Sequence, residues 1–279
     1  MSWGLLGVGG ACSVCLMLPL AAKWKLPTIP AVVGIASATL MAAVPFLWVY
    51  PLCETEWGLV ACVLAQAALT FALGLSLMLI RFFRDPDRVP PEADGVVLSA
   101  ADGEVLYVRT VAGETTPLVT KRGRSYLLSE LTGSELVEGP VQVIGVEMTF
   151  LDVHVTRCPT AGRVRLLKHI KGEFLSLRRE ESPFVNERHT TVIENPLLDV
   201  AVVQVASRLV RRVQSFLALD ETVRAGQRLG MIRFGSLVAV VLPERAGLTV
   251  EVKAGDRVTA GVSVLARVGA AEGEQAIEP

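Results

Sequence analysis

Long apolar stretches fill the first third of the chain, and short apolar stretches separated by polar turns fill the rest. Three uninterrupted apolar runs come first, at about 3–22, 28–50 and 57–80. Each approaches the ~20 residues that a helix needs to cross the hydrocarbon layer of a bilayer. Only four charged side chains lie within residues 1–80: Lys23, Lys25, Glu54 and Glu56. The pattern predicts a transmembrane anchor over 1–80 and a water-facing domain over 81–279.

The charges that flank the apolar runs predict the orientation of the anchor. The run at 3–22 has no basic segment before it, so we interpret it as an uncleaved span, not a signal peptide. Basic residues lie after the first and third runs, at Lys23, Lys25, Arg81, Arg84 and Arg88. Positive flanks stay in the cytoplasm. Three spans therefore place residues 81–279 at the cytoplasmic face of the inner membrane, and a two-span hairpin over 28–80 would do the same.

Short β-branched runs predict that residues 81–279 form a mainly β domain of the α+β class. A linker at 84–92, rich in proline and charge, precedes it. No long helical period follows. The predicted strands are Gly95–Ser99, Val105–Val111, Val141–Val146, Arg163–Leu167, Thr190–Glu194, Val200–Leu209 and Ser236–Leu242.

An internal repeat suggests a compact β fold and a function without catalysis. Val223-Arg-Ala-Gly-Gln-Arg-Leu229 is echoed by Val252-Lys-Ala-Gly-Asp-Arg-Val258, and each copy predicts a strand, a tight glycine turn and a strand. Such pairs resemble the hairpins of lipoyl and biotinyl carrier domains. No lysine stands at a hairpin tip between two Met or Ala residues, where a cofactor would be attached, so we expect the fold without the carrier chemistry.

Composition and cysteine spacing narrow the range of partners. A formal charge of −1 gives no reason to expect nucleic acid as a partner. The five cysteines have neither a disulfide nor a zinc spacing. We therefore expect no metal site.

The dipeptide Gly235-Ser236 is the first candidate for chemistry. A serine hydroxyl can attack the preceding carbonyl only through an unusual backbone bend, which glycine tolerates best. Taken alone, however, the pair is better explained by a bulge in a buried strand. Any imidazole base must be His154, His169 or His189. Alternation places Asp152, His154 and Thr156 on one strand face, which is either functional or simply solvated. His169 is expected on a solvated strand or turn, and Glu187 with Arg188 in a structural ion pair.

Six motifs occur in a fixed order behind the apolar runs. They are Phe82-Phe-Arg-Asp-Pro-Asp-Arg88, Ser99-Ala-Ala-Asp-Gly103, Phe150-Leu-Asp-Val-His-Val-Thr-Arg-Cys-Pro159, Lys171-Gly-Glu-Phe174, Asn186-Glu-Arg188 and Phe234-Gly-Ser236. Over about 82–268 the chain resembles the phosphatidylserine decarboxylase proenzymes of the short bacterial and archaeal type.

The resemblance implies self-cleavage between Gly235 and Ser236. It gives a β chain ending at 235 and an α chain of 236–279 whose first residue becomes a pyruvoyl cofactor, and the two chains stay associated. The lipid amine forms a Schiff base with this group, and phosphatidylserine loses CO₂ to become phosphatidylethanolamine. The implied triad is Asp102, His154 and Ser236, with Asp102 matched through Ser99-Ala-Ala-Asp-Gly103.

One position departs from the family pattern. Longer members carry a second histidine three residues after the first, where this chain has Arg157. His154 then serves both reactions or shares them with another group, and Arg157 or Lys171 could contact the lipid phosphate by charge. Two alternatives remain: a serine hydrolase using Ser236, His154 and Asp102 without self-cleavage, and a lipoyl-like module on a membrane anchor.

Overall fold

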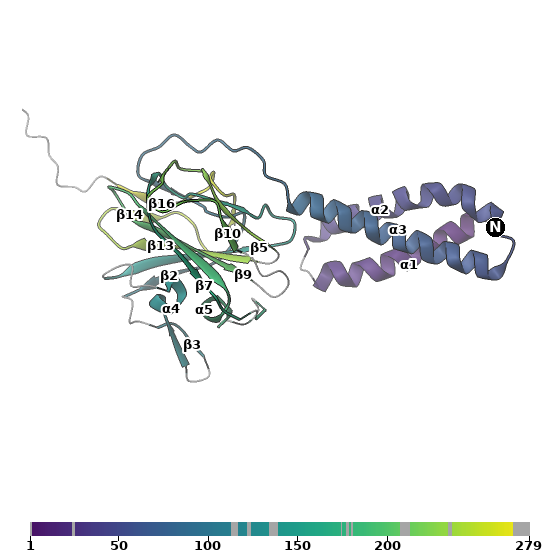
Figure 1. The fold of residues 1–279 in the computed structure, drawn as a ribbon, viewed down its shortest axis with the longest axis horizontal. Helices are drawn as coiled ribbons and strands as arrows, with labels where there is room; N and C mark the ends of the chain where they lie inside the picture. The colour runs from purple at the N-terminus through teal and green to yellow at the C-terminus, as the bar shows by residue number, and fades with distance from the viewer. Residues whose placement is uncertain are drawn as a thin grey trace, which may run out of the picture. The chain divides into compact units, whose positions relative to one another are not determined.

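The structure is a computed structural model in which the chain forms two compact units (Figure 1). One unit comprises Met1–Arg84 with Thr149–Leu151, and the other comprises Asp85–Met148 with Asp152–Pro279. The structure describes residues 2–23, 26–112, 117–121, 124–133, 139–173, 175–176, 179, 181–206, 213–233 and 236–269.

The first unit is a bundle of three long apolar helices. They are α1 (Ser2–Lys23), α2 (Thr28–Val49) and α3 (Glu56–Phe82), with the short 3-10 helix η1 (Tyr50–Leu52) after α2. All three predicted apolar runs are therefore helices. Each is long and apolar enough to cross a membrane.

Polar side chains inside the bundle are paired with one another. Tyr50 donates its hydroxyl to Gln66 Oε1 at 2.9 Å, and Ser13 Oγ lies 3.2 Å from Thr70 Oγ1. In an apolar solvent such interhelical hydrogen bonds, together with small residues at the interface, hold helices together because no hydrophobic effect does so. Ala38 is one such small residue, and it is fully buried.

The second unit is built from antiparallel β-sheets. The largest has eight strands in the order β11-β7-β8-β9-β13-β5-β2-β15. Their bounds are β2 Gly103–Val111, β5 Val141–Met148, β7 Gly162–Ile170, β8 Arg188–Glu194, β9 Val200–Ala206, β11 Thr222–Val223, β13 Ser236–Pro243 and β15 Arg257–Val258. The predicted mainly β class is confirmed.

Smaller sheets and helices complete this unit. Two three-stranded sheets have the orders β1-β16-β14 and β10-β12-β6, and β3 pairs with β4. The bounds are β1 Val96–Leu98, β3 Pro117–Lys121, β4 Arg124–Leu127, β6 Val155–Arg157, β10 Val213–Ser215, β12 Arg228–Ile232, β14 Leu248–Val250, β16 Val264–Val268, α4 Leu128–Thr132 and α5 Ser182–Val185.

Strand β13 lies at the centre of the large sheet with both faces covered. Val238 and Val240 belong to the core cluster shared with β1, β10, β12 and β16, whereas Leu237 and Ala239 belong to the cluster shared with α4 and α5. A strand buried on both faces needs apolar residues at every position, and each large one contributes about 1.5–3 kcal/mol. This explains the continuous apolar run that follows Ser236.

Every predicted strand has a counterpart in the structure, with end positions that shift by a few residues. Positions 207–209 of the predicted Val200–Leu209 lie outside the described residues. The two glycine turns of the repeat are confirmed, with positive φ angles at Gly226 (75°) and Gly255 (94°). The strands beside each turn pair with other strands, because β11 joins β7, β12 joins β10 and β6, and β15 joins β2. The repeats therefore connect sheets and are not isolated hairpins.

Candidate active site

Ser236 is the first residue of β13 and is flanked by a strand on each side. Its register partners are Met148, the last residue of β5, and Ala206, the last residue of β9. Gly235 lies outside the described residues. Both register partners are buried in the core cluster that also contains Ile232. The bond proposed for cleavage thus precedes the point where the central strand enters the sheet.

His154 lies just before β6 and is fully buried. The prediction that Asp152 and His154 belong to the strand itself is wrong, because β6 begins at Val155, and burial of both residues excludes a solvated edge. The backbone of Ile232 donates a hydrogen bond to the His154 carbonyl at 3.2 Å. Four residues separate Ile232 from Ser236, so the two Cα atoms are at most about 14 Å apart. The His154 backbone is therefore bonded to the segment that leads into β13.

The imidazole of His154 is oriented by its own segment. Its Nδ1 lies 2.9 Å from the main-chain carbonyl oxygen of Asp152. A carbonyl oxygen only accepts, so Nδ1 must carry the proton. In the neutral ring Nε2 then holds the basic lone pair, which is the state that a general base requires. Asp152 itself is held by Arg257, whose guanidinium lies 2.6 Å from the carboxylate. The alternation of Asp152 with His154 was the sequence signal for this arrangement, although the carbonyl and not the carboxylate makes the contact.

A buried polar bridge connects the two sheets near His154. Gln204 Nε2 of β9 donates to Thr156 Oγ1 at 2.9 Å, and Thr156 Oγ1 donates to the Gly230 carbonyl at 3.1 Å. Buried hydrogen bonds of this kind fix one packing arrangement, since a lost partner leaves a desolvated polar group. Gln204 is the register partner of Val238, two residues after Ser236. The bridge therefore fixes the position of β6 relative to the start of β13.

Asn186 and Glu187 support the end of β9 beside Ser236. Asn186 Nδ2 donates to the Ala206 carbonyl at 3.0 Å, and the Ala206 amide donates to the Glu187 carbonyl at 2.9 Å. The Asn186 side chain also holds Leu175 N and O, each at 2.8 Å. The Asn186-Glu-Arg188 motif thus positions the strand that pairs with Ser236.

The predicted ion pair between Glu187 and Arg188 is wrong. Neighbouring residues of a strand point to opposite faces. Glu187 accepts from His169 Nε2 at 2.9 Å, and Arg188 donates to the carbonyls of Glu130, Leu131 and Asn186. His169 is about half exposed on β7, as predicted.

Asp102, the predicted orienting acid, is held by other groups. Its carboxylate forms a bidentate pair with Arg88 at 2.5 and 2.8 Å and accepts from the Ala260 amide at 2.8 Å. Both partners of the ion pair are nearly buried. The proposed orienting role toward His154 stays a prediction. In the structure, Asp102 binds Arg88 and so holds the linker that follows α3 against the β domain.

Arg157 fastens the same linker. Its guanidinium donates to Asp85 at 3.0 Å, to the Pro86 carbonyl at 2.8 Å and to the Gly226 carbonyl at 3.0 Å. Burial lowers the pKa of Arg157, and Asp85 opposes that shift. Arg228 also pairs with Asp85. The proposed phosphate contact of Arg157 stays a prediction, since these described contacts give it a positioning role.

The remaining candidate is Lys171, and Cys158 is the one cysteine in the sequence of residues 81–279. Lys171 is exposed in the loop after β7. Cys158 is buried at the end of β6, and burial raises the pKa of its thiol to about 12. A protonated thiol is a poor nucleophile. The proposed role of Lys171 in substrate binding stays a prediction, and Cys158 is a packing residue.

Replacing Asp102 by asparagine is expected to destabilise the chain by about 3 kcal/mol, because it leaves the Arg88 charge buried without its counter-ion. The Tm should fall by about 6–12 °C for a domain of this size. The matched control is Asp220→Asn, which breaks the exposed pair with Arg163 and should cost less than about 1 kcal/mol. An Asp102→Asn chain that melts like the parent but no longer cleaves itself would instead support the orienting role.

His189 should make the stability of the fold depend on pH. Burial, and then the nearby His169, lower the pKa of His189 from 6.5 to about 4. Between these values the unfolded chain binds the proton more readily, so the stabilisation is complete above pH 6.5 and is lost as the pH falls toward 4. We expect Tm to decline across this interval and His189→Gln to flatten the decline. Equal slopes for the two chains would refute this assignment.

Comparison with known proteins points to one family. Residues 75–266 match the family model for phosphatidylserine decarboxylase. A phosphatidylserine decarboxylase proenzyme of Carboxydothermus hydrogenoformans is 34% identical over 77% of this chain and 95% of its own length. One from Erythrobacter litoralis is 35% identical over 79% of this chain and 85% of its own length. A protein of Methanocaldococcus jannaschii, provisionally named archaetidylserine decarboxylase proenzyme, is 38% identical over 69% of this chain and 90% of its own.

Proposed function

The chain belongs to the phosphatidylserine decarboxylase family, and from that premise we propose that it cleaves itself at Gly235–Ser236 and then decarboxylates a serine phospholipid. One observation carries the assignment of the site. Ser236 starts the central strand between β5 and β9, and His154 is hydrogen-bonded to the chain four residues before it. The family places this activity among the carboxy-lyases.

Self-cleavage requires a base for the serine hydroxyl, and His154 is the proposed base. Ser236 Oγ attacks the Gly235 carbonyl carbon as Nε2 takes the hydroxyl proton, and the acyl group moves from nitrogen to oxygen. Loss of the Ser236 Cα proton then breaks the Cβ–O bond and releases the first 235 residues as a carboxylate. Water replaces the nitrogen of the resulting dehydroalanine, ammonia leaves, and residue 236 is a pyruvoyl group.

The residues present fit a pyruvoyl group because its precursor is a serine at a strand start, preceded by glycine. Once formed, the group supplies an electron-accepting carbonyl for the amine of the substrate, without an added cofactor. His154 would hold the proton that the substrate carbon takes up after CO₂ leaves. Met148 and Ala206, the register partners of Ser236, are buried apolar residues, so we expect the strand start to exclude water. Exclusion of water favours loss of a charged carboxylate.

The two fragments are expected to stay associated after cleavage. Strand β13 pairs along its length with β5 and along six residues with β9, and β16 pairs with β1. The fragment 236–279 therefore supplies the central strand of the large sheet. It should co-elute with the larger fragment on gel filtration in mild detergent and separate from it in denaturant. Separate elution of intact fragments without denaturant would contradict this.

The substrate and the membrane orientation are proposed from the same features. Two relatives are named for phosphatidylserine and one for archaetidylserine, so the shared chemistry is a serine phosphodiester headgroup. The three apolar helices, each long enough to cross a bilayer, support the proposal that the chain is anchored in a membrane. The basic residues after α1 and α3 favour the cytoplasmic face of the inner membrane for the β domain.

Two other functions receive less support. A serine hydrolase would keep Ser236 within an uncut chain, and a lipoyl-like module would need no nucleophile at all. Family membership favours neither. The direct test is to supply the purified chain with phosphatidylserine in mixed micelles and measure CO₂ and phosphatidylethanolamine. We expect both products in equal amounts, and a cleaved chain that forms neither would refute the proposed reaction.

A further inference from the structure

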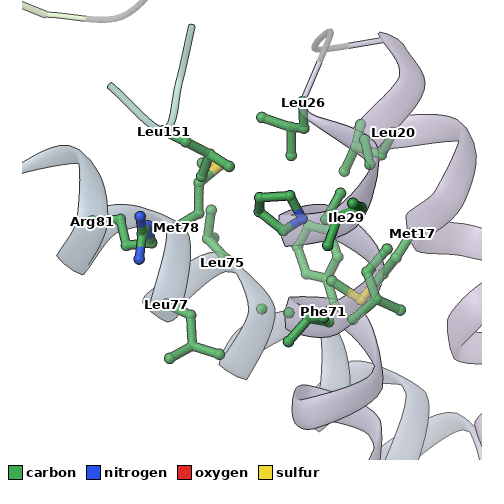
Figure 2. A pocket seen from close by; sticks show the side chains of 17 residues that line it. Met17, Leu20, Leu26, Ile29, Phe71, Leu75, Leu77, Met78, Arg81 and Leu151 are labelled. Atoms are coloured by element: carbon green, nitrogen blue, oxygen red, sulfur yellow. The ribbon is translucent and has the colours of Figure 1, made fainter. Parts of the chain in front are cut away.

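The helical bundle contains an apolar cavity of about 430 Å³ (Figure 2). Side chains from all three helices line it, among them Met17 of α1, Ile29 of α2 and Phe71 of α3. Leu151, which belongs to the same unit, also lines it. A space of this size lies in the range of sites that bind small molecules.

The lining excludes water and suits a hydrocarbon chain. Apart from Arg81, the lining side chains are apolar. Water in a cavity needs two or more polar partners, so an apolar cavity does not retain it. The cavity lies between helices long enough to cross a bilayer, where lipid tails are the surrounding solvent. A lipid tail is therefore the occupant that its surroundings supply.

Arg81 is the one charged residue among the described residues that line the cavity. It lies in the last turn of α3, three residues after Met78, and Figure 2 shows it at the edge of the apolar group beside Met78. Among the residues that the structure describes, no carboxylate forms an ion pair with the Arg81 guanidinium. An arginine near the end of a membrane helix extends toward the headgroup layer. There it would meet lipid phosphate.

We propose that this cavity seats one acyl chain of an anionic membrane phospholipid whose phosphate pairs with Arg81. The proposal goes beyond the decarboxylation, because it concerns a lipid held by the anchor whether or not the β domain is active. Residues 1–74, which supply most of the lining, lie outside the family match at 75–266.

Gly34 offers a way to fill the cavity without disturbing the bundle. It lines the cavity, and a Cβ added there would meet no atom within 4 Å. Gly34→Leu therefore places a side chain in the proposed path of the acyl chain. Gly7→Leu is the matched control: Gly7 is exposed on α1, has the same open surroundings and does not line the cavity.

The test measures lipid retained by the full chain. The chain and its variants are reconstituted in nanodiscs of equal parts phosphatidylglycerol and phosphatidylcholine, extracted in mild detergent and analysed by native mass spectrometry. We expect the parent and Gly7→Leu to keep one phospholipid, mostly phosphatidylglycerol. Gly34→Leu should retain about tenfold less phospholipid than the parent. Displacing only two methylene groups of the acyl chain from the cavity is enough to lower the affinity by this factor. Arg81→Gln should keep a lipid but lose the preference for phosphatidylglycerol.

Several results would overturn the proposal. A parent chain that retains no lipid has no such seat. Equal retention by Gly34→Leu and Gly7→Leu, whether high or low, would show that the cavity does not determine binding. If Arg81→Gln still preferred phosphatidylglycerol, the proposed contact between Arg81 and the lipid phosphate would be ruled out. None of these measurements depends on decarboxylation. A failure of the lipid-binding proposal can therefore be distinguished from a failure of the proposed function.

Discussion

Replacing Ser236 by alanine is expected to leave the chain at full length on a denaturing gel and to abolish CO₂ release from phosphatidylserine. The reason is chemical. Alanine has no oxygen to accept the acyl group and no leaving group on Cβ, so neither the cleavage nor the pyruvoyl group can form. Its small apolar side chain is compatible with a strand whose neighbours are apolar. The fold should therefore persist while both reactions disappear.

The matched control is Ser215→Ala, another serine at the end of a strand. Ser215 Oγ accepts from the Leu217 amide at 3.3 Å and has no proposed part in the chemistry. This variant should cleave and decarboxylate like the parent. Cleavage between residues 235 and 236 in the Ser236→Ala chain would rule out the acyl shift.

Replacing His154 by asparagine is expected to slow self-cleavage by about 10²-fold or more, the usual contribution of a positioned general base. Asparagine was chosen because its amide nitrogen can take the place of Nδ1 and donate to the Asp152 carbonyl, which preserves this hydrogen bond. It has no counterpart of Nε2. A loss of rate in a chain that still melts cooperatively would then report the missing base.

The control for His154 is His169→Gln, since His169 is half exposed and pairs with Glu187 on β7. It should change neither reaction. Cleavage and CO₂ release should be measured separately for His154→Asn, because this chain has Arg157 where longer family members have a second histidine. Undiminished rates in both steps would remove His154 from the mechanism, and loss of only one step would show which reaction it serves.

The features that local pattern determines could be predicted from the sequence. Apolar runs of membrane length gave the three helices, and β-branched runs between turn residues gave the strands, including the one that begins at Ser236. Glycine turns at Gly226 and Gly255 were also recognisable, because a positive φ favours glycine. These signals arise within a few residues of one another.

Contacts between distant segments could not be predicted in the same way. Arg157 meets Asp85 across 72 residues, and Arg88 meets Asp102 only because the linker returns to the β domain. Charge suggested a phosphate ligand at Arg157, and the family resemblance suggested an orienting acid at Asp102; both roles stay predictions. The tautomer of His154 depends on a hydrogen bond to a main-chain carbonyl oxygen. Every residue has such an oxygen, so the residue types in the sequence do not indicate this contact. The partners of each strand beside a turn likewise depend on the whole sheet.

Intact-mass analysis of the small fragment tests the central claim most directly. A fragment of residues 236–279 that begins with a pyruvoyl group is lighter by one ammonia molecule than the same fragment beginning with serine. It should also resist amine-reactive labelling at its first residue and react there with a hydrazine. We expect the lighter, ketone-blocked fragment. A fragment that starts with a free serine amine would contradict the account.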